Sequence, residues 1–336
     1  MSPLHLRRRV ATARRLAAEE GRRRLSARAR GGIVLLYHRV ADLEADPQLL
    51  SVAPANFDAH MELLASACTP LPLAELAERV RNGKVPPGAV AVTFDDGYRD
   101  NLEAALPRLT RHSVPATVFV ATGYVGTARE FWWDEFERLL LLPEGGTGAV
   151  RAGGDGFRFD LATAAGREDA YARAHRLLRQ RTPETIDAAL GHLREQLGEP
   201  PEGAGRDSYR AMNPDELRRL VESGLVVAGA HTRRHPSLAA QPLERQREEI
   251  EGSRDDLADW LGAPPATFSY PFGTPGVDFR RDTARLVEDA GFATATANFP
   301  GRVTRWSDRF RLERLLVRDW TVDELERQLA GFARAG

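Results

Sequence analysis

The chain has 336 residues, of which 42% are hydrophobic, and its formal net charge is −1. This composition allows a sizeable buried core and excludes a protein whose whole surface is built to bind polyanions. Cys68 is the only cysteine, so neither an internal disulfide nor a metal site made of several thiolates can form.

The chain begins with an arginine-rich arm. Residues 1–30 contain ten arginines against two acidic residues, Glu19 and Glu20. Because arginine interrupts the arm every few positions, it lacks the apolar stretch of about 7–15 residues that a secretory signal needs. No window reaches the roughly 18 apolar residues of a transmembrane helix. We therefore expect a cytoplasmic protein that does not bind nucleic acid. The arm is expected to be a solvated tail or a helix that makes a peripheral contact with anionic lipid.

Short apolar runs rich in branched residues recur along the rest of the chain and predict buried strands. These runs are residues 33–37, 90–94, 116–121, 225–230, 267–270, 293–297 and 312–317. Amphipathic stretches of helical length separate most of them, at 56–67, 73–81, 100–112, 214–223, 242–261 and 279–290. This alternation predicts an α/β fold, a distorted (β/α)7-8 barrel with helices outside a parallel sheet. Such barrels carry their chemistry at the carboxyl ends of the strands.

The segment from about residue 127 to 212 interrupts the alternation, and we predict a mainly helical insertion in a barrel that spans 31–336. The segment begins with Phe131-Trp132-Trp133-Asp134 and then passes through a glycine-rich patch at 145–156. Two helical patterns follow, near 166–181 and 183–197. The tryptophan pair is expected either to pack in a core or to form a platform for a sugar ring, since aromatic faces suit such rings.

Two polar segments stand at the ends of predicted strands. Thr93-Phe94-Asp95-Asp96-Gly97 places two adjacent carboxylates together, and a cation would relieve their mutual repulsion. In His231-Thr232-Arg233-Arg234-His235-Pro236, two imidazoles four residues apart can converge on one cation if the segment forms a tight loop or a helical turn. One aspartate and two histidines make a three-ligand set typical of catalytic Zn²⁺. Either segment alone could instead be an ordinary turn or a surface loop.

Together, these two segments resemble the first two signature motifs of the polysaccharide deacetylases, the NodB-homology or carbohydrate esterase family 4 enzymes. The resemblance covers about residues 32–126 and 213–320. It implies that Asp95 is the general base and that Asp96, His231 and His235 bind a divalent metal, with Zn²⁺ the expected ion.

The segment Ser269-Tyr270-Pro271-Phe272-Gly273 resembles the family's third motif, which forms a wall of the substrate groove. The resemblance implies a substrate or oxyanion role for Tyr270, Pro271 and Phe272. The backbone N–H of Phe272 would be the donor that stabilises the oxyanion in the transition state. A plain Pro-Gly turn is the alternative interpretation.

The sequence departs from the family's commonest pattern in two places. The third motif often begins with an arginine that pairs with the catalytic aspartate, but Ser269 stands there, and Arg314 on the last predicted strand is a candidate replacement. The late Leu-x-His motif that supplies the catalytic acid is absent, because His235 is the last histidine. His38 resembles the early histidine of the biofilm-polysaccharide deacetylase branch and is the candidate acid. Alternatively, His38 only shapes the barrel mouth.

The resemblance implies a metal-dependent hydrolase that removes N-acetyl groups from an N-acetylated sugar or polysaccharide precursor, and such a glycan is the expected partner. An O-acetyl esterase or another amidase on a glycoconjugate would need the same metal and oxyanion site, so the sequence does not separate these activities. A catalytically inactive glycan-binding protein is a third alternative.

Overall fold

The computed structural model describes residues 31–142, 145–199 and 205–334. The arginine-rich arm lies outside the described residues, and so does its predicted lipid contact. The centre of the fold is a nine-stranded sheet in which most neighbours are parallel, in the order β11-β10-β9-β6-β5-β1-β12, with β13 beside β1 and β4 beside β5. Its strands are β1 (Gly31–Tyr37), β4 (Thr69–Pro70), β5 (Ala89–Phe94), β6 (Ala116–Val120), β9 (Val226–Ala230), β10 (Thr267–Ser269), β11 (Thr294–Thr296), β12 (Val303–Thr304) and β13 (Leu315–Leu316). The predicted α/β class is confirmed.

The sheet curls so that its two edges approach each other, as expected for a distorted barrel. On one side, β13 lies parallel to β1. On the other, Leu312 forms a parallel bridge with Thr296 in β11, and its backbone bonds to Ala295 and Ala297 on either side. The segment 309–316 therefore runs between β11 and β1.

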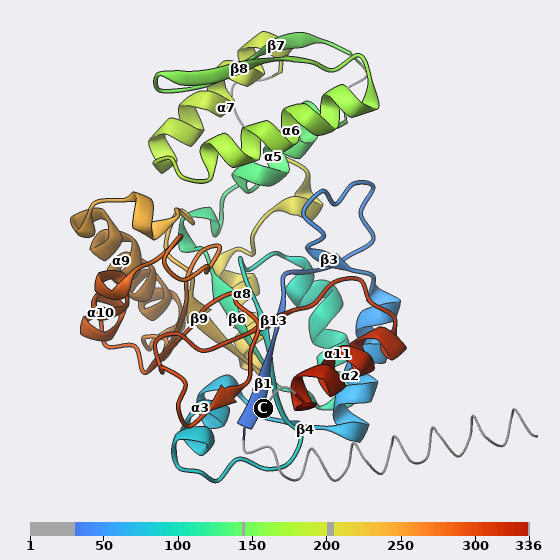
Figure 1. Cartoon of the computed structure of the whole chain (residues 1–336), viewed down its shortest axis with the longest axis vertical. Helices are drawn as coiled ribbons and strands as arrows, with labels where there is room; N and C mark the ends of the chain where they lie inside the picture. Colours follow the sequence, from blue (N-terminus) through green and yellow to red (C-terminus); the bar gives the residue numbers. More distant parts are fainter. Residues whose placement is uncertain (1–30, 143–144, 200–204, 335–336) are drawn as a thin grey trace, which may run out of the picture.

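Helices lie outside the sheet (Figure 1). They are α2 (Pro54–Ala67), α3 (Leu73–Arg81), α4 (Leu106–His112), α8 (Pro214–Glu222), α9 (Leu243–Leu261), α10 (Arg281–Asp289) and α11 (Val322–Arg334), and short turns of helix are η1 (Asn101–Ala105), η2 (Thr122–Tyr124), η3 (Asp207–Tyr209) and η4 (Leu238–Ala240). Every residue of β1 is buried, and its side chains alternate between two cores, Leu35 and Tyr37 in one and Val34 in the other. The remaining short pair is β2 (Arg39–Val40) with β3 (Ser51–Val52).

Between β6 and β9 the chain forms a separate layer on the barrel, which we call the β6–β9 segment (residues 127–212; green, at the top of Figure 1). It contains α5 (Trp132–Leu140), β7 (Thr147–Ala152), β8 (Asp155–Asp160), α6 (Ala164–Leu178) and α7 (Pro183–Leu197). The two predicted helices are present. The glycine-rich patch, however, forms most of an antiparallel hairpin that was not predicted, with Gly153-Gly154 as its two-residue turn.

The β6–β9 segment has a hydrophobic core of its own. Its members include Trp132, Phe136, Tyr171 and Leu190, and a few barrel residues such as Tyr98 complete it. Within the described ranges, no helix is both long and apolar enough to cross a membrane.

Candidate active site

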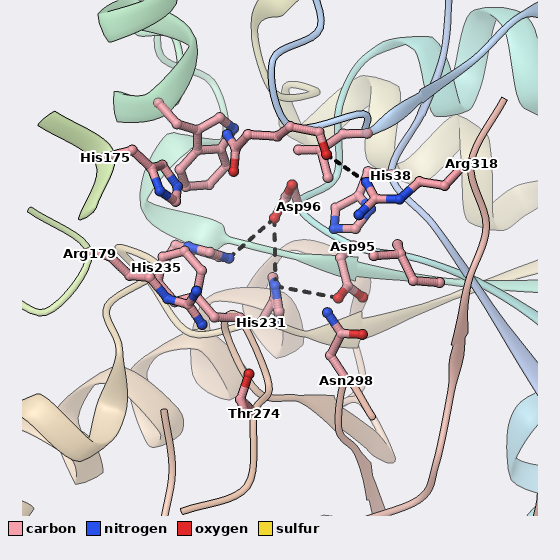
Figure 2. A pocket seen from close by; sticks show the side chains of 15 residues that line it. His38, Asp95, Asp96, His175, Arg179, His231, His235, Thr274, Asn298 and Arg318 are labelled. Carbon is pink, nitrogen blue, oxygen red and sulfur yellow. Dashed lines mark hydrogen bonds and ion pairs between the residues drawn. The ribbon is translucent and has the colours of Figure 1, made fainter. Parts of the chain in front are cut away.

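A pocket of about 230 Å³ opens at the carboxyl ends of the parallel strands. Its walls include most of the side chains predicted from the sequence, namely His38, Asp95, Asp96, His231, His235 and Phe272. They stand at the ends of β1, β5, β9 and β10 or in the loops that follow these strands, as expected for a barrel. Figure 2 shows Asp96 facing both His231 and His235, with Asp95 beside His231.

The three predicted metal ligands converge although they come from distant parts of the chain. Asp96 Oδ1 lies 3.6 Å from His231 Nε2 and 3.4 Å from His235 Nε2. One ligand atom from each side chain can be chosen so that all three lie within 4.8 Å of one another, and all three residues are buried. The geometry brings together one oxygen and two nitrogen donors, the set that Zn²⁺ prefers at catalytic sites.

The surroundings of this triad fit a cation. Asp96 Oδ1 is buried and has no hydrogen-bond partner among the described residues. Burial and the neighbouring Asp95 carboxylate hold the pKa of Asp96 well above its usual range. A divalent cation between the three side chains would satisfy this oxygen and relieve the repulsion between the two carboxylates.

The two imidazoles are in the state that metal ligands need. Burial lowers the pKa of His231, and burial together with His231 holds the pKa of His235 well below its usual range. Both rings are therefore neutral at pH 7. His231 Nδ1 lies 2.7 Å from the Ser269 carbonyl, so Nδ1 donates its hydrogen there and the Nε2 lone pair faces Asp96.

A tight loop, not a helical turn, brings the two histidines together. His235 N–H donates to Thr232 Oγ1 at 3.0 Å, and both residues have positive φ angles, of 55° and 65°. The backbone N–H groups of Arg233 and Arg234 both donate to Glu249 in α9 at 2.8 Å. On the other side, Gly123 N–H donates to the Arg233 carbonyl, and a Cβ atom at position 123 would lie only 2.8 Å from that oxygen.

Asp95 occupies a different electrostatic environment from Asp96. Arg314 donates to both of its carboxylate oxygens, at 2.7 and 2.8 Å, and Ser269 Oγ donates to one of them at 3.3 Å. Burial would raise the pKa of Asp95, but Arg314 and His231 together hold it below its usual range. The suggestion that Arg314 pairs with this aspartate is confirmed, and Ser269 joins the pair by accepting a hydrogen bond from Arg314 at 2.9 Å.

His38 lines the pocket next to Asp95 (Figure 2). Its Nδ1 is buried and has no hydrogen-bond partner in the part of the chain that the structure describes. Burial lowers the pKa of His38 to about 4, although the charge of Asp95 opposes the shift. The imidazole is therefore neutral at pH 7, and it lines the pocket with its buried Nδ1 unpaired among the described residues.

The third predicted motif contributes one residue to the pocket wall. Phe272 lines the pocket, has a φ angle of 57°, and its N–H has no hydrogen-bond partner within the described residues. Tyr270 and Pro271 are buried behind it. The Tyr270 ring stacks on Phe279 at 3.8 Å and its hydroxyl donates to the Phe310 carbonyl, so this side chain faces the core and does not line the pocket.

Comparisons with known proteins agree with this geometry. The family model described as polysaccharide deacetylase matches residues 82–143 and 204–295. The chain is similar to this family over these two ranges, which together make up just under half of its 336 residues. Both motifs that carry the metal triad lie inside the matched ranges, whereas residues 144–203 of the β6–β9 segment lie outside them.

Two solved structures share the overall fold of this chain. The Streptococcus pyogenes deacetylase PplD in complex with acetate has a TM-score of 0.58 and 16% identity, over 89% of this chain and 98% of that one. IcaB from Ammonifex degensii has a TM-score of 0.58 and 19% identity, over 91% and 98%.

Among curated proteins, the poly-beta-1,6-N-acetyl-D-glucosamine N-deacetylase of Staphylococcus aureus is 35% identical over 77 residues, or 23% of this chain. The chain spans only 37% and 27% of the lengths of two curated relatives that it matches.

Several pocket residues were not singled out from the sequence. Among them, His175 and Arg179 come from the β6–β9 segment, and Asn298 and Arg318 follow β11 and β13. In Figure 2, His175 and Arg179 lie on the side of His235, and Arg318 lies beside His38. The one available signal was the tryptophan pair, which was weighed as a core element or a sugar platform. Trp133 is 3% exposed, so it is a core residue that also reaches the pocket.

Proposed function

We propose that this protein is a metal-dependent N-deacetylase that acts on an N-acetylated sugar or glycan. The observation that supports it best is the convergence of Asp96, His231 and His235 beside the Arg314-paired Asp95. Asp96, His231 and His235 would hold the cation, for which Zn²⁺ suits the donor set. A cation bound there supplies Lewis acidity, which polarises a carbonyl and makes water easier to deprotonate.

In the proposed reaction, water attacks the acetamide carbonyl and Asp95 accepts the proton from that water. Arg314 keeps Asp95 ionised and fixes the direction of its carboxylate through two charge-assisted hydrogen bonds. The Phe272 N–H donates to the oxygen that becomes negatively charged as the new C–O bond forms. The bond between the acyl carbon and nitrogen then breaks.

His38 is the proposed acid that protonates the leaving amine. Because the pKa of His38 is about 4 in the free protein, this imidazole must take up its proton during turnover. The proton that Asp95 removes from water is the source, and His38 passes it to the leaving nitrogen. The products are acetate and a free amino sugar. The polysaccharide deacetylase family and the staphylococcal relative, named as an N-deacetylase of poly-beta-1,6-N-acetyl-D-glucosamine, support an N-acetylated glycan as the substrate class.

The test measures acetate released from β-1,6-linked N-acetylglucosamine oligomers, with matched O-acetylated sugars as the alternative substrates. We expect chelation to abolish release from the N-acetylated oligomers and added Zn²⁺ to restore it. Asp96→Ala should lose metal and activity together. Asp95→Asn and His38→Gln should retain metal but lose about 10²–10⁴-fold in turnover.

Two results would contradict the proposal. Full activity in exhaustively chelated protein would exclude the metal dependence. A metal-loaded protein that binds these oligomers but releases no acetate from any acetylated sugar would indicate a glycan-binding protein. Release from O-acetylated sugars alone would redirect the proposal to an esterase.

A further inference from the structure

The two imidazoles of the triad are oriented in different ways. His231 is fixed by the hydrogen bond from its Nδ1 to the Ser269 carbonyl, at 2.7 Å. His235 Nδ1 is buried but has no hydrogen-bond partner among the described residues. The orientation of the His235 ring therefore depends on packing.

Three rings surround His235. The Trp133 ring centroid lies 4.6 Å from that of His235, and the Phe272 and His231 centroids each lie 4.8 Å from it. Phe272 and His231 belong to the barrel, whereas Trp133 stands on α5 of the β6–β9 segment. Trp133 thus has the shortest centroid distance to His235 of the three rings, and it is the one that does not belong to the barrel.

Trp133 is itself held firmly in position. Its Nε1–H donates to the Tyr98 hydroxyl at 2.9 Å, and that hydroxyl donates to Asp134 Oδ2 at 2.7 Å. Phe131 stacks on the Trp133 ring, with centroids 4.9 Å apart and an interplanar angle of 11°. Tyr98, Trp133 and Asp134 are all buried, so a shift of the indole would break buried hydrogen bonds.

We propose that Trp133 is a positioning residue for His235, and that Tyr98 and Asp134 hold the indole in the orientation this role requires. The inference rests on the proposed function, since it treats His235 as a metal ligand. It assigns to the β6–β9 segment a part in metal binding. Groups that orient a ligand typically change metal affinity by about 10–100-fold when they are altered.

The chain offers a matched control one residue away. Trp132 stands on the same helix and is 2% exposed, against 3% for Trp133. Its Nε1 has no hydrogen-bond partner among the described residues, and its ring stacks on His175 with centroids 5.2 Å apart. Trp132→Phe and Trp133→Phe therefore remove the same atoms from the same helix, but only the second removes the hydrogen bond to Tyr98.

The experiment measures the Zn²⁺ affinity of the full chain by competition with a chromophoric chelator, together with the absorption spectrum of the Co²⁺-loaded protein. We expect Trp133→Phe to weaken Zn²⁺ binding by about 10–100-fold and to change the Co²⁺ spectrum. Trp132→Phe should remain close to wild type in both. Tyr98→Phe, which leaves both indoles in place, should change affinity in the same direction as Trp133→Phe.

Melting temperatures of the metal-free proteins separate positioning from folding. If Trp133→Phe lowers the melting temperature but leaves the Zn²⁺ affinity and the Co²⁺ spectrum unchanged, the residue is only structural and the inference is wrong. If Trp133→Phe does not fold, Tyr98→Phe takes its place in the test. A folded Tyr98→Phe protein with wild-type Zn²⁺ affinity would also show that the inference is wrong. Failure of the proposed function looks different, because wild type would then bind no more Zn²⁺ than Asp96→Ala.

Discussion

At the scale of single residues, the two adjacent carboxylates of the site have opposite pKa shifts, lowered for Asp95 and raised for Asp96. Asp95 receives two hydrogen bonds from the buried Arg314 guanidinium, which compensates its charge. The ionisable partners of Asp96 are the His231 and His235 imidazoles, and both are neutral at pH 7. Arg314 thus favours the ionised form of one carboxylate, and the other has no cationic partner among the described residues, which suits their proposed roles as base and metal ligand.

Arg314→Lys tests how much the direction of the Asp95 carboxylate matters. Lysine keeps the positive charge but cannot donate two parallel hydrogen bonds, so Asp95 should lose its fixed orientation. We expect kcat to fall by about 10²-fold, the typical cost of a small misplacement of a catalytic group, with bound Zn²⁺ unchanged. Steady-state kinetics and elemental analysis measure the two quantities.

Arg311→Lys is the control, since Arg311 is exposed and stands on the same segment. An unchanged kcat in Arg314→Lys would show that charge alone, without geometry, suffices at Asp95.

Site residues that belong to short sequence motifs could be predicted from the sequence. A site residue that reaches the pocket only through tertiary contacts, such as Arg314, could only be suggested. Asp95, Asp96, His231 and His235 stood out because two chemical groups recur within a few positions. Arg314 lies 219 residues from Asp95, and its choice over other arginines depends on how β13 pairs with β1. No local pattern records such a contact.

At the scale of elements, strained backbone gathers where the strands end. Among the described residues, six that are not glycine have positive φ angles, and four of them belong to the site: Asp96, Thr232, His235 and Phe272. Each such conformation costs of order 1–3 kcal/mol and persists only where the surroundings impose it. Here the anchors include Glu249 in α9 and Gly123 after β6, so regular elements hold the irregular loops.

Helix α8 leads into β9, the strand that ends at His231, and its start is held by a reciprocal cap. Asn213 Oδ1 accepts from Glu216 N–H at 2.9 Å, and Glu216 accepts from Asn213 N–H at 2.8 Å. Asn213→Ala should lower the free energy of unfolding by about 1 kcal/mol, whereas Asn213→Asp keeps the acceptor and should lose little. Urea denaturation measures both, and equal losses in the two variants would contradict a capping role.

Elements with strong periodicity were predictable, and those set by turn chemistry or by pairing were not. The α3 helix was predicted with its exact bounds because its apolar positions recur on one face. The β7–β8 hairpin was missed, although Val150 and Ala152 alternate with exposed neighbours before a Gly-Gly turn, which is a hairpin signal. The predicted strand 312–317 shortened to β13, because Leu312 pairs with β11 while Leu315 and Leu316 pair with β1.

At the scale of the whole molecule, the barrel and the β6–β9 segment both contribute side chains to the pocket. The barrel supplies Asp95, Asp96, His231 and His235, and the β6–β9 segment adds Trp133, His175 and Arg179. The family model covers residues on both sides of 144–203 but not those residues. Asp95, Asp96, His231 and His235 thus lie within the matched ranges, as does Trp133, whereas His175 and Arg179 line the same pocket from the unmatched residues.

The pair Asp95 and Asp96 also links metal binding to the stability of the whole fold. Without a cation, the ionised form of the Asp96 carboxyl group is unfavourable, because the group is buried and lies next to Asp95. Its raised pKa reflects both effects. Asp96→Asn removes this repulsion, so the metal-free variant should be at least as stable as metal-free wild type. Added Zn²⁺ at about 100 times its Kd should stabilise wild type by about 2.7 kcal/mol and the variant by much less. The order of stability should therefore reverse between chelated and Zn²⁺-saturated samples in urea denaturation. Equal stabilisation of both proteins by Zn²⁺ would place the cation elsewhere and remove Asp96 from its ligands.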